Sequence, residues 1–561
     1  MKPFFLCLLL LSSAGAFGQA GYFWVNQLAS SANSASANAV ATDAAGNSYV
    51  TGSFSGTAQW GSLSLTSRGR TDLYVVKYSS AGKAQWVARL GNDLSAPDPY
   101  SANYARYTAN GTAISLDGQG NVYIAGGFTG KVSGDSGGQL RSFSEDSFTT
   151  GLIAKLNGRG IFQWAQRFGG QQYACHAYDI ATDAAGNSYL TGQSDDGRME
   201  FGGAVVGNNS RRVLFVARYT TTGAVSWSQV SGNAIGYGAS GSAVLLDKQG
   251  NCLVGGFFNH DMVLAGTSLT TPSADSYLAS FEPRTGKLRW IQQGGGTGDK
   301  TISRLALDRQ GNIYAAGHYG ANTTLNGQAL PAFGGNTDIF LARYSPGGTL
   351  QWVLPLGTSA DEYPVGLATE ADGTSTLLST FYPPSASSQP QQTLLQTFRP
   401  DGSLYHTETL GTSGSCVVRH VTTLSQSGRL VLAGNLSGAA QFGSVTLQVP
   451  TGTAGFVASR RLHVTPASPS HYNQPALDVS PNPAHGYLMA RLSWANPALV
   501  LAGQATLLTF MGKVVATQSL VTNGTAQVQA YFDCTSLPPG LYVLQLRTTD
   551  GLTHSQGVAI Q

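Results

Sequence analysis

The sequence predicts an all-β protein: a seven-bladed β-propeller followed by a small C-terminal β-sandwich. Three observations lead to this fold class. The 71 glycines and the low share of charged residues, 11%, favour short strands and tight turns over helices. A D-x-x-G-N motif recurs along most of the chain. That repeat stops at a segment rich in Pro and Ser, and a different pattern of alternating apolar residues begins after this segment.

The first residues indicate export. Lys2 precedes the apolar run from Phe4 to Leu11, and small residues follow at Ala14, Ala16 and Gly18. This order of charged, apolar and small residues is typical of a secretory signal peptide, which we place at residues 1–18. The run is too short to cross about 30 Å of hydrocarbon, and we expect no transmembrane segment elsewhere.

Charge and cysteine usage exclude several classes of partner and site. The net charge of +3 comes without blocks of Lys or Arg, so nucleic acid is not an expected partner. Cys175, Cys252, Cys416 and Cys534 stand singly, without the spacing of a zinc site or a disulfide framework. We interpret them as small buried residues.

The repeat unit has two recognisable halves. The first half carries the D-x-x-G-N turn between two apolar runs, and its seven copies begin at Ala39, Ala113, Asp179, Ala243, Arg304, Gly366 and His420. The second half joins two further runs through an S/P-x-G turn, and the last run bears a Trp, as in Trp86, Trp164 and Trp227. Each unit therefore reads as a four-stranded antiparallel sheet.

Such sheets must stack to bury both faces. Radial stacking gives a propeller. A β-solenoid is the alternative, but its rungs are shorter than these units of roughly 60 residues. The seventh unit ends at Leu462 without a Trp strand, while Trp24 lies in an unassigned strand at the N-terminus. We expect that strand to complete the last blade, so that residues 19–462 form a closed ring.

These motifs resemble a known family. The segment D-x-x-G-N-x-Y-x-x-G, followed by F/Y-x-A-K/R-Y and Q-W, is similar to the SBBP repeats of bacterial extracellular proteins, over about residues 21–462. The resemblance implies a seven-bladed propeller and an extracellular setting. It brings no catalytic residues.

A second domain follows the linker at residues 463–475. Over residues 476–561, the segments Pro481-Asn482-Pro483, Gly512-Lys513 and Leu537–Tyr542 resemble the type A C-terminal sorting domain of the type IX secretion system of Bacteroidota. The resemblance implies a partner, the type IX machinery, and a secreted or outer-membrane-attached location. The chain ends in HSQGVAIQ, without the basic residue often found at the end of that family.

The recurring aspartates and tryptophans have structural explanations. Asp43, Asp117, Asp183, Asp247 and Asp308 recur at one position, but each turn has one carboxylate, fewer than a calcium loop supplies. Hairpin chemistry explains them better. The Trp at the same strand of each blade indicates packing between blades rather than a sugar-stacking array.

No catalytic motif and no cluster of metal ligands is recognisable, so we expect no catalytic residues, metal or cofactor. The connections from the fourth strand of one blade to the first strand of the next must share one face, and we expect a binding surface there. Its candidate residues are Tyr100, Tyr104, Arg106, Tyr107, His176, Tyr178, Asp299, Asp361, Glu362 and Tyr363.

The leading hypothesis is a monomeric, secreted or cell-surface propeller that binds a glycan or a protein through this face. The alternative is a secreted polysaccharide hydrolase or lyase on the same scaffold, with Asp299, Asp361 and Glu362 as convergent acids. Ordinary solvated loops would explain the same residues.

Overall fold

The computed structural model describes residues 21–32, 34–92, 107–135, 137–141, 148–170, 173–210, 212–232, 238–358, 360–382, 391–410, 415–424, 428–461, 476–480, 482, 484–493, 503–509, 513–522, 527–548 and 553–561. Within these ranges every regular element is a β-strand, which confirms the predicted all-β class. The predicted signal peptide and the linker at residues 463–475 lie outside the described residues.

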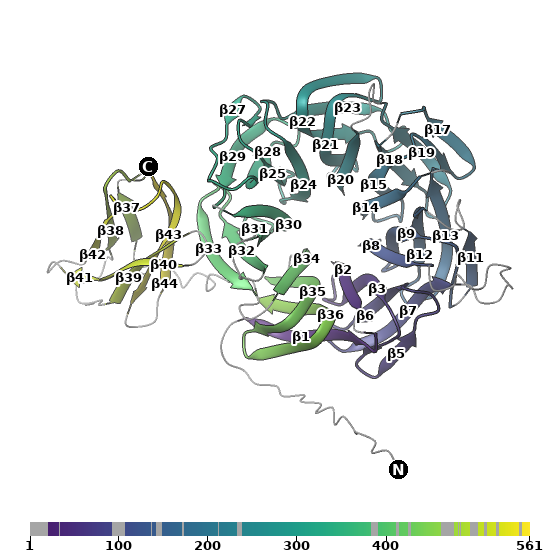
Figure 1. Ribbon diagram of the computed structural model, residues 1–561, viewed down its shortest axis with the longest axis horizontal. Coiled ribbons are helices and arrows are strands. Elements are labelled where there is room, and N and C mark those ends of the chain that lie inside the picture. Colours follow the sequence, from purple (N-terminus) through teal and green to yellow (C-terminus); the bar gives the residue numbers. More distant parts are fainter. Residues whose placement is uncertain are drawn as a thin grey trace, which may run out of the picture.

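Antiparallel four-stranded units follow one another around a ring, the propeller (Figure 1), and the described strands make seven such units. We call them blades one to seven, and we number the strands in each from the centre outward. Blade one contains β2 (Ala35–Thr42), β3 (Ser48–Phe54), β6 (Asp72–Tyr78) and β7 (Ala84–Asn92). Blade two contains β8 (Ala109–Leu116), β9 (Val122–Phe128), β12 (Thr150–Leu156) and β13 (Phe162–Gly169). Blade three contains β14 (Cys175–Thr182), β15 (Ser188–Ser194), β18 (Val213–Tyr219) and β19 (Val225–Val230).

The remaining blades continue the same order. Blade four contains β20 (Ala239–Leu246), β21 (Cys252–Leu264), β22 (Thr267–Phe281) and β23 (Leu288–Gln293). Blade five contains β24 (Lys300–Leu307), β25 (Ile313–Tyr319), β28 (Asp338–Tyr344) and β29 (Leu350–Leu356). Blade six contains β30 (Asp361–Thr369), β31 (Ser375–Tyr382), β32 (Gln392–Phe398) and β33 (Leu404–Leu410). Blade seven contains β34 (Ser415–Leu424), β35 (Arg429–Phe442), β36 (Val445–Arg461) and β1 (Tyr22–Ser30).

The two ends of the ring are joined by strand pairing. β1 runs antiparallel to β36, with Trp24 opposite Ser459 and Leu28 opposite Gly455. Blade seven thus takes its first three strands from the last part of the propeller sequence and its fourth strand from the N-terminal segment. Because β1 covers the open edge of β36, the backbone groups of that edge are paired.

The D-x-x-G-N turns are held by their own side chains. Asp43 accepts hydrogen bonds from the backbone N–H and the side-chain amide of Asn47, at 2.9 and 2.8 Å. Gly46 has φ of 82°, a conformation that glycine adopts without a steric cost. The same contacts recur between Asp117 and Asn121. Both carboxylate oxygens are therefore used inside the turn, as expected for hairpin chemistry.

Each fourth-strand Trp packs on a turn of the next blade. The indole N–H of Trp24 donates to the carbonyl of Ser80 at 3.1 Å, and a Cβ built on Gly82 would lie 2.6 Å from the Trp24 ring. Trp86 and Gly160 repeat this arrangement one blade further on. The predicted role of the Trp set in packing between blades is therefore confirmed, and the turn glycine is what makes room for the ring.

The arrangement changes between blades six and seven. His406 pairs with Thr397 as Trp86 pairs with Lys77, so it holds the Trp position of blade six. Blade seven has no third-to-fourth turn to receive a Trp, since its third and fourth strands come from distant parts of the chain. An ion pair lies there instead, with Arg460 Nη2 2.7 Å from Glu408 Oε2.

Short hairpins between the second and third strands reach back to the preceding blade. The hairpin of β4 (Thr57–Trp60) and β5 (Leu63–Thr66) pairs with β1. Those of β10 (Lys131–Gly134) with β11 (Gly137–Arg141), and of β16 (Arg198–Phe201) with β17 (Ala204–Gly207), pair with β7 and β13. β26 (Thr324–Leu325) and β27 (Gln328–Ala329) form a separate hairpin in blade five. Trp60 and Phe442 are each the last paired residue before a hairpin turn and are both buried, so they occupy one structural repeat position.

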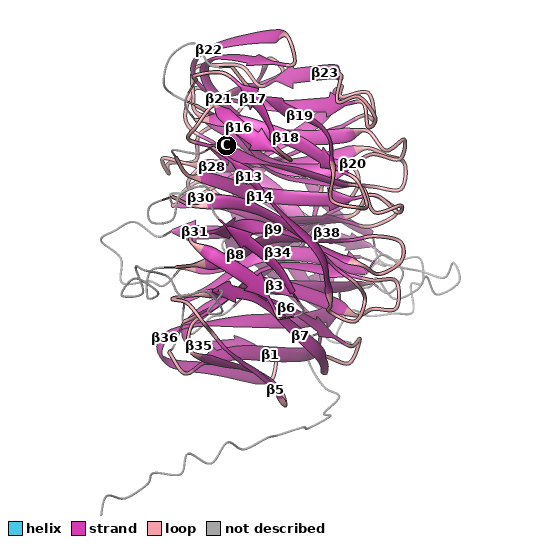
Figure 2. Ribbon diagram, turned by 90° about the vertical axis from the view of Figure 1, so that its right-hand side faces the viewer, coloured by secondary structure: helices cyan, strands magenta, loops and turns pink. Residues whose placement is uncertain are grey.

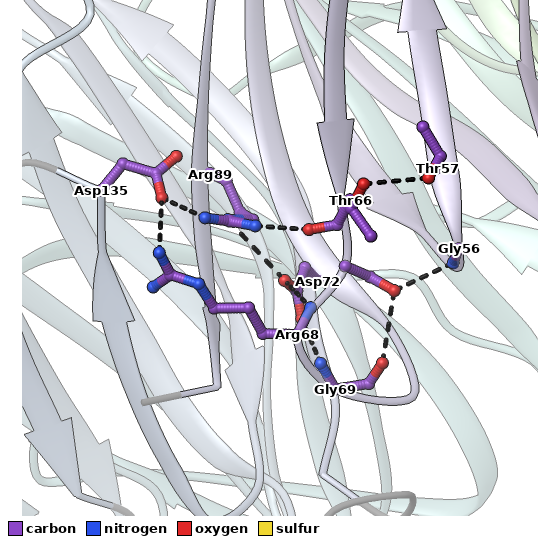
Figure 3. A network of polar contacts seen from close by, with 9 residues as sticks. Gly56, Thr57, Thr66, Arg68, Gly69, Asp72, Arg89 and Asp135 are labelled. Atoms are coloured by element: carbon purple, nitrogen blue, oxygen red, sulfur yellow. Dashed lines mark hydrogen bonds and ion pairs between the residues drawn. The ribbon is translucent and has the colours of Figure 1, made fainter. Parts of the chain in front are cut away.

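A polar network supports the hairpin contacts between blades one and two (Figure 3). Asp72, at the start of β6, accepts the backbone N–H groups of Arg68 and Gly69 at 2.7 and 3.1 Å. Arg89 from β7 lies between Asp72 and Asp135, and donates to Asp135 of the next blade. The buried Asp72 carboxylate is thus satisfied by backbone groups and a guanidinium.

The ring has two unlike faces, seen from the side in Figure 2, where loops gather at both ends of the strands. Because the strands alternate in direction, the D-x-x-G-N and third-to-fourth turns share one face. The second-to-third hairpins and the fourth-to-first connections share the opposite face, which we call the loop face. The first strand of each blade begins at the loop face.

The C-terminal domain is a sandwich of two sheets with its own core. One sheet contains β37 (Ala476–Ser480), β38 (Tyr487–Ser493), β41 (Val521–Thr522) and β42 (Gln527–Asp533). The other contains β39 (Gly503–Thr509), β40 (Val514–Ser519), β43 (Gly540–Thr548) and β44 (Thr553–Ile560). Leu488, Leu507, Phe532 and Leu544 are buried between them.

This domain rests against blade six (Figure 1), where β44 lies beside the outer strand β33. Val543 is buried in one cluster with Leu356, Phe398 and Leu404 of the ring. The contact leaves a cavity of ≈ 250 Å³ between the two parts. The domain therefore has a separate core and a small apolar contact with the propeller.

Candidate functional site

The first strands surround the axis of the ring (Figure 1). Each of them carries a bulge. A register shift leaves one residue per strand without a partner on the second strand, as at Tyr178 in β14 and Arg419 in β34. The residues at this position, which we call the bulge residues, are Asn38, Thr112, Tyr178, Ser242, Ser303, Val365 and Arg419. Tyr178 and Arg419 are exposed. Bulges of this kind re-aim side chains, here on the strands nearest the axis.

Several polar side chains of the first strands link neighbouring blades. Asn38 donates to the carbonyl of Gly111 at 2.9 Å, and Thr112 donates to that of Ala177 at 2.8 Å. Asp179 accepts the backbone N–H of Val244 at 2.8 Å. These contacts are structural, because they connect the innermost strands of adjacent blades.

A cavity of ≈ 360 Å³ lies on the axis. It lies between the bulges and the D-x-x-G-N turns, on the side away from the loop face. All seven first strands contribute to its wall, and its ionisable residues are Asp179, Arg304 and His420. Burial raises the pKa of Asp179 to about 6. Burial and the charge of Arg304 lower the pKa of His420 to about 4, so this imidazole is neutral at pH 7. Burial also lowers the pKa of Arg304.

Two aromatic groups lie where first and second strands reach the loop face. His176 and Tyr178 of β14 have nearly parallel rings with centroids 6.3 Å apart. In blades five and six, Tyr363 meets the ring of His318 edge-on at 5.0 Å and that of Tyr382 at 5.5 Å. Tyr178 is 42% and Tyr382 37% exposed. Burial lowers the pKa of His318 to about 4, so it packs as a neutral ring.

The predicted site residues differ in location and in burial. Tyr100, Tyr104 and Arg106 lie outside the described residues. The expectation of exposure is wrong for Tyr107 and Glu362, which are 6% and 2% exposed. Tyr107 is buried because its ring packs over Gly130, which leaves no room there for a side chain.

The predicted acids do not converge on open space. Asp299 is exposed, and it accepts the backbone N–H of Ala274 at 3.0 Å. Asp361 accepts the N–H groups of Asn336 and Thr337 at 2.7 and 3.2 Å. Glu362 accepts the hydroxyl of Thr358.

Glu362 belongs to an unusual buried pair. It lies near Asp338, and each carries one buried oxygen without a hydrogen-bond partner, Glu362 Oε2 and Asp338 Oδ1. Burial raises the pKa of Glu362 to about 8 and that of Asp338 to about 6. One blade earlier, the equivalent positions hold an ion pair, with Lys300 Nζ 3.1 Å from Asp275 Oδ1. The pair in blades five and six thus lacks the cation that Lys300 supplies one blade earlier.

Sequence reasoning missed the residues that line the axis. Asp179, Arg304 and His420 share one repeat position, where blades one, two and four have alanine and blade six has glycine. A polar residue at an otherwise small position was the available signal. In the described part of the chain, no group of three or more His, Cys, Asp or Glu residues is arranged to hold a metal ion.

Two family models match the chain. A β-propeller repeat model, SBBP, matches residues 163–197, which run from β13 into blade three. A secretion system C-terminal sorting domain model matches residues 478–561, the two-sheet sandwich described above. The chain ends in a type IX sorting domain. This sorting domain marks secreted, cell-surface or outer-membrane-attached proteins and implies the type IX machinery as a partner. Among the described residues we find no helix long and apolar enough to span a membrane.

Two relatives are similar to part of this chain. A WD repeat-containing protein, L264, of Acanthamoeba polyphaga mimivirus is 23% identical over 56% of this chain. The regulatory protein FlaEY of Caulobacter vibrioides is 24% identical over 55% of it. The matches cover 26% and 32% of those proteins, so the chain spans a third or less of their length.

Solved structures with a similar course include a family PL25 ulvan lyase, with 12% identity and a TM-score of 0.39, covering 74% of this chain and 93% of the lyase. A virginiamycin B lyase from Staphylococcus aureus has 8% identity and a TM-score of 0.38, covering 77% of this chain and 98% of the lyase.

Proposed function

We propose that this secreted or cell-surface propeller binds a glycan on its loop face. The observation that carries this proposal is the placement of the two aromatic groups, His176 with Tyr178 and Tyr363 with His318 and Tyr382. They come from blades three, five and six, and they lie at the same end of the strands.

The chemistry of these groups suits a sugar. A tyrosine offers an apolar ring face to sugar C–H groups and a hydroxyl to sugar oxygens. Tyr178 and Tyr382 present such rings to solvent. The edge-on packing of Tyr363 between His318 and Tyr382 holds that ring in place, which reduces the entropy lost on binding.

Binding is favoured over catalysis by the state of the acids. A glycosidase or lyase needs an acid or base within hydrogen-bond reach of its substrate. Asp299 and Asp361 are already used by backbone N–H groups, and Glu362 is 2% exposed. We further propose that residues 1–18 are removed on export, so that the mature chain begins before β1.

The test uses the mature full-length chain, residues 19–561, on an immobilised panel of bacterial, algal and host glycans, followed by calorimetry with the best ligand. We expect Tyr178→Ala and Tyr382→Ala each to weaken binding about tenfold, since each removes one stacking surface. Tyr531→Ala is the matched control, because Tyr531 is 55% exposed but lies on the sorting domain.

Three results would overturn the proposal. The first is an absence of binding to the whole panel. The second is binding that the Tyr178 and Tyr382 variants leave unchanged. The third is cleavage of a polysaccharide that Glu362→Gln abolishes, which would establish the enzymatic alternative.

A further inference from the structure

Positive charge exceeds negative charge at and directly beside the axial cavity. Among the described residues of the seven first strands, the charged groups near it are Asp179 of β14, Arg304 of β24 and Arg419 of β34. His420 also lines the cavity, but it is neutral at pH 7 because its pKa is about 4. Arg304 and Asp179 line the cavity, and Arg419 directly precedes the lining residue His420, so two cations lie at or beside the cavity against one carboxylate.

The carboxylate is already occupied. The two oxygens of Asp179 accept the backbone N–H groups of Ile180 and Val244, at 2.9 and 2.8 Å. Its charge reaches Arg304 through space, and in the described part of the chain no ion pair joins the two side chains. The positive charge of the arginines is thus only partly balanced.

Arg304 is held in place by the backbone. Its Nε donates to the carbonyl of Val365 at 3.0 Å, and its Nη1 donates to that of Ser303 at 2.8 Å. Its Nη2 lies 3.5 Å from the carbonyl of Arg419. This last contact brings the guanidinium of blade five to the bulge of blade seven.

Arg419 is the second cation. As the bulge residue of β34 it has no partner on β35, its side chain is exposed, and its neighbour His420 lines the cavity. The charge of Arg419 lowers the pKa of Arg304, after the larger effect of burial. Two like charges that repel each other are stabilised together by one anion bound near both.

We infer that the axial cavity binds a small oxyanion, a sulfate or a sugar carboxylate, between Arg304 and Arg419. The planar guanidinium group can donate two hydrogen bonds in parallel to a pair of oxygens on a carboxylate or a sulfate. The volume of ≈ 360 Å³ falls within the range of small-molecule sites and admits a monosaccharide acid. This site lies farther from the loop face than the aromatic groups do. The inference does not depend on the glycan proposal.

The experiment compares ligands of different charge on the mature full-length chain. Calorimetry and thermal unfolding are measured with sodium sulfate, sodium glucuronate and neutral glucose, at an ionic strength equalised with sodium chloride. We expect sulfate or glucuronate to bind with a stoichiometry of one. A sulfate-only response identifies free sulfate as the source, and a glucuronate-only response identifies a sugar acid.

The variants separate the site from general salt effects, because sulfate stabilises many proteins by exclusion from their surfaces. Arg419→Gln should weaken binding about tenfold or more and remove the extra rise in melting temperature. Arg419→Lys should retain part of it. Arg159→Gln removes an exposed arginine from a turn of blade two and should change nothing.

An equal response of wild type and Arg419→Gln to both anions would overturn the inference, as would binding of glucose as strong as that of glucuronate. Binding that Arg159→Gln weakens as much as Arg419→Gln would also overturn it, because a diffuse charge effect would then explain the result.

Discussion

Glu362 occupies in blade six the position that Lys300 occupies in blade five. Both lie three residues before the bulge of a first strand, and both face an aspartate at the start of the third strand of the preceding blade. Lys300 forms a buried ion pair with Asp275, whereas Glu362 faces Asp338 without a cation. One substitution of charge at a repeat position therefore converts an ion pair into a pair of acids.

This pair should make stability depend on pH. Burial raises the pKa of Glu362 to about 8 in the folded protein, from an ordinary value of 4.5. A carboxyl with a raised folded pKa stabilises the fold below its unfolded pKa and loses that contribution as the pH rises through the folded value. We expect the free energy of unfolding to fall by a few kcal/mol between about pH 4.5 and about pH 8, at about 1.4 kcal/mol per pKa unit.

Denaturant unfolding of wild type and Glu362→Gln at pH 5 and pH 9 tests this expectation. The variant lacks the titrating group, so it should lose less stability between the two values. Glu282→Gln changes an exposed glutamate and is the control. A wild type and a Glu362→Gln variant with the same pH dependence would show that Glu362 does not titrate in this range.

The contact of Trp24 with Gly82 predicts a cost for a single methyl group. Gly82 has φ of 79°, and a Cβ there would lie 2.6 Å from the Trp24 ring. Gly61 has a similar φ of 64° with nothing within 4 Å of a Cβ. We expect Gly82→Ala to lower the free energy of unfolding by about 1 to 3 kcal/mol more than Gly61→Ala, because only the first adds overpacking to the backbone strain. Equal losses would mean that the Trp24 contact is loose.

Removal of residues 21–30 should open the ring. The deletion takes β1 from the edge of β36, removes the buried Leu28, and leaves β4 paired with β5 alone. An exposed strand edge pairs with other chains, so we expect aggregation together with a lower melting temperature. Light scattering and calorimetry measure the two effects. A monomeric deletion variant with unchanged thermal stability would show that β1 does not hold the ring closed.

Removal of residues 476–561 should separate export from folding. The sorting domain has its own core, so the propeller should remain folded and accumulate in the periplasm of a type IX-competent host. Loss of Val543 from the shared apolar cluster exposes Leu404 of blade six and Leu356 of blade five, for which we expect a small drop in melting temperature. Fractionation and protease accessibility measure the location, and surface display of the truncated protein would contradict the prediction.

Periodic features were readable from the sequence. The D-x-x-G-N turns close through contacts between residues four apart, as from Asp43 to Asn47. The Trp of the fourth strand, present in every blade but the sixth, and the glycine in the turn that receives it recur along the chain, so their roles repeat. The strand that bears Trp24 could be assigned because one blade lacked a fourth strand. Local chemistry and the period thus determined the strands, the turns and the domain order by themselves.

The content of the axis and of the blade junctions was decided only by the tertiary structure. Arg304 and Arg419 are 115 residues apart in sequence, yet the ring places the guanidinium of one against the carbonyl of the other. Glu362 was expected on an open surface, but the position three residues before the bulge is buried between blades whatever residue occupies it. Burial and proximity across blades set the charge state of these groups. Neither quantity can be deduced from the spacing of residues along the chain.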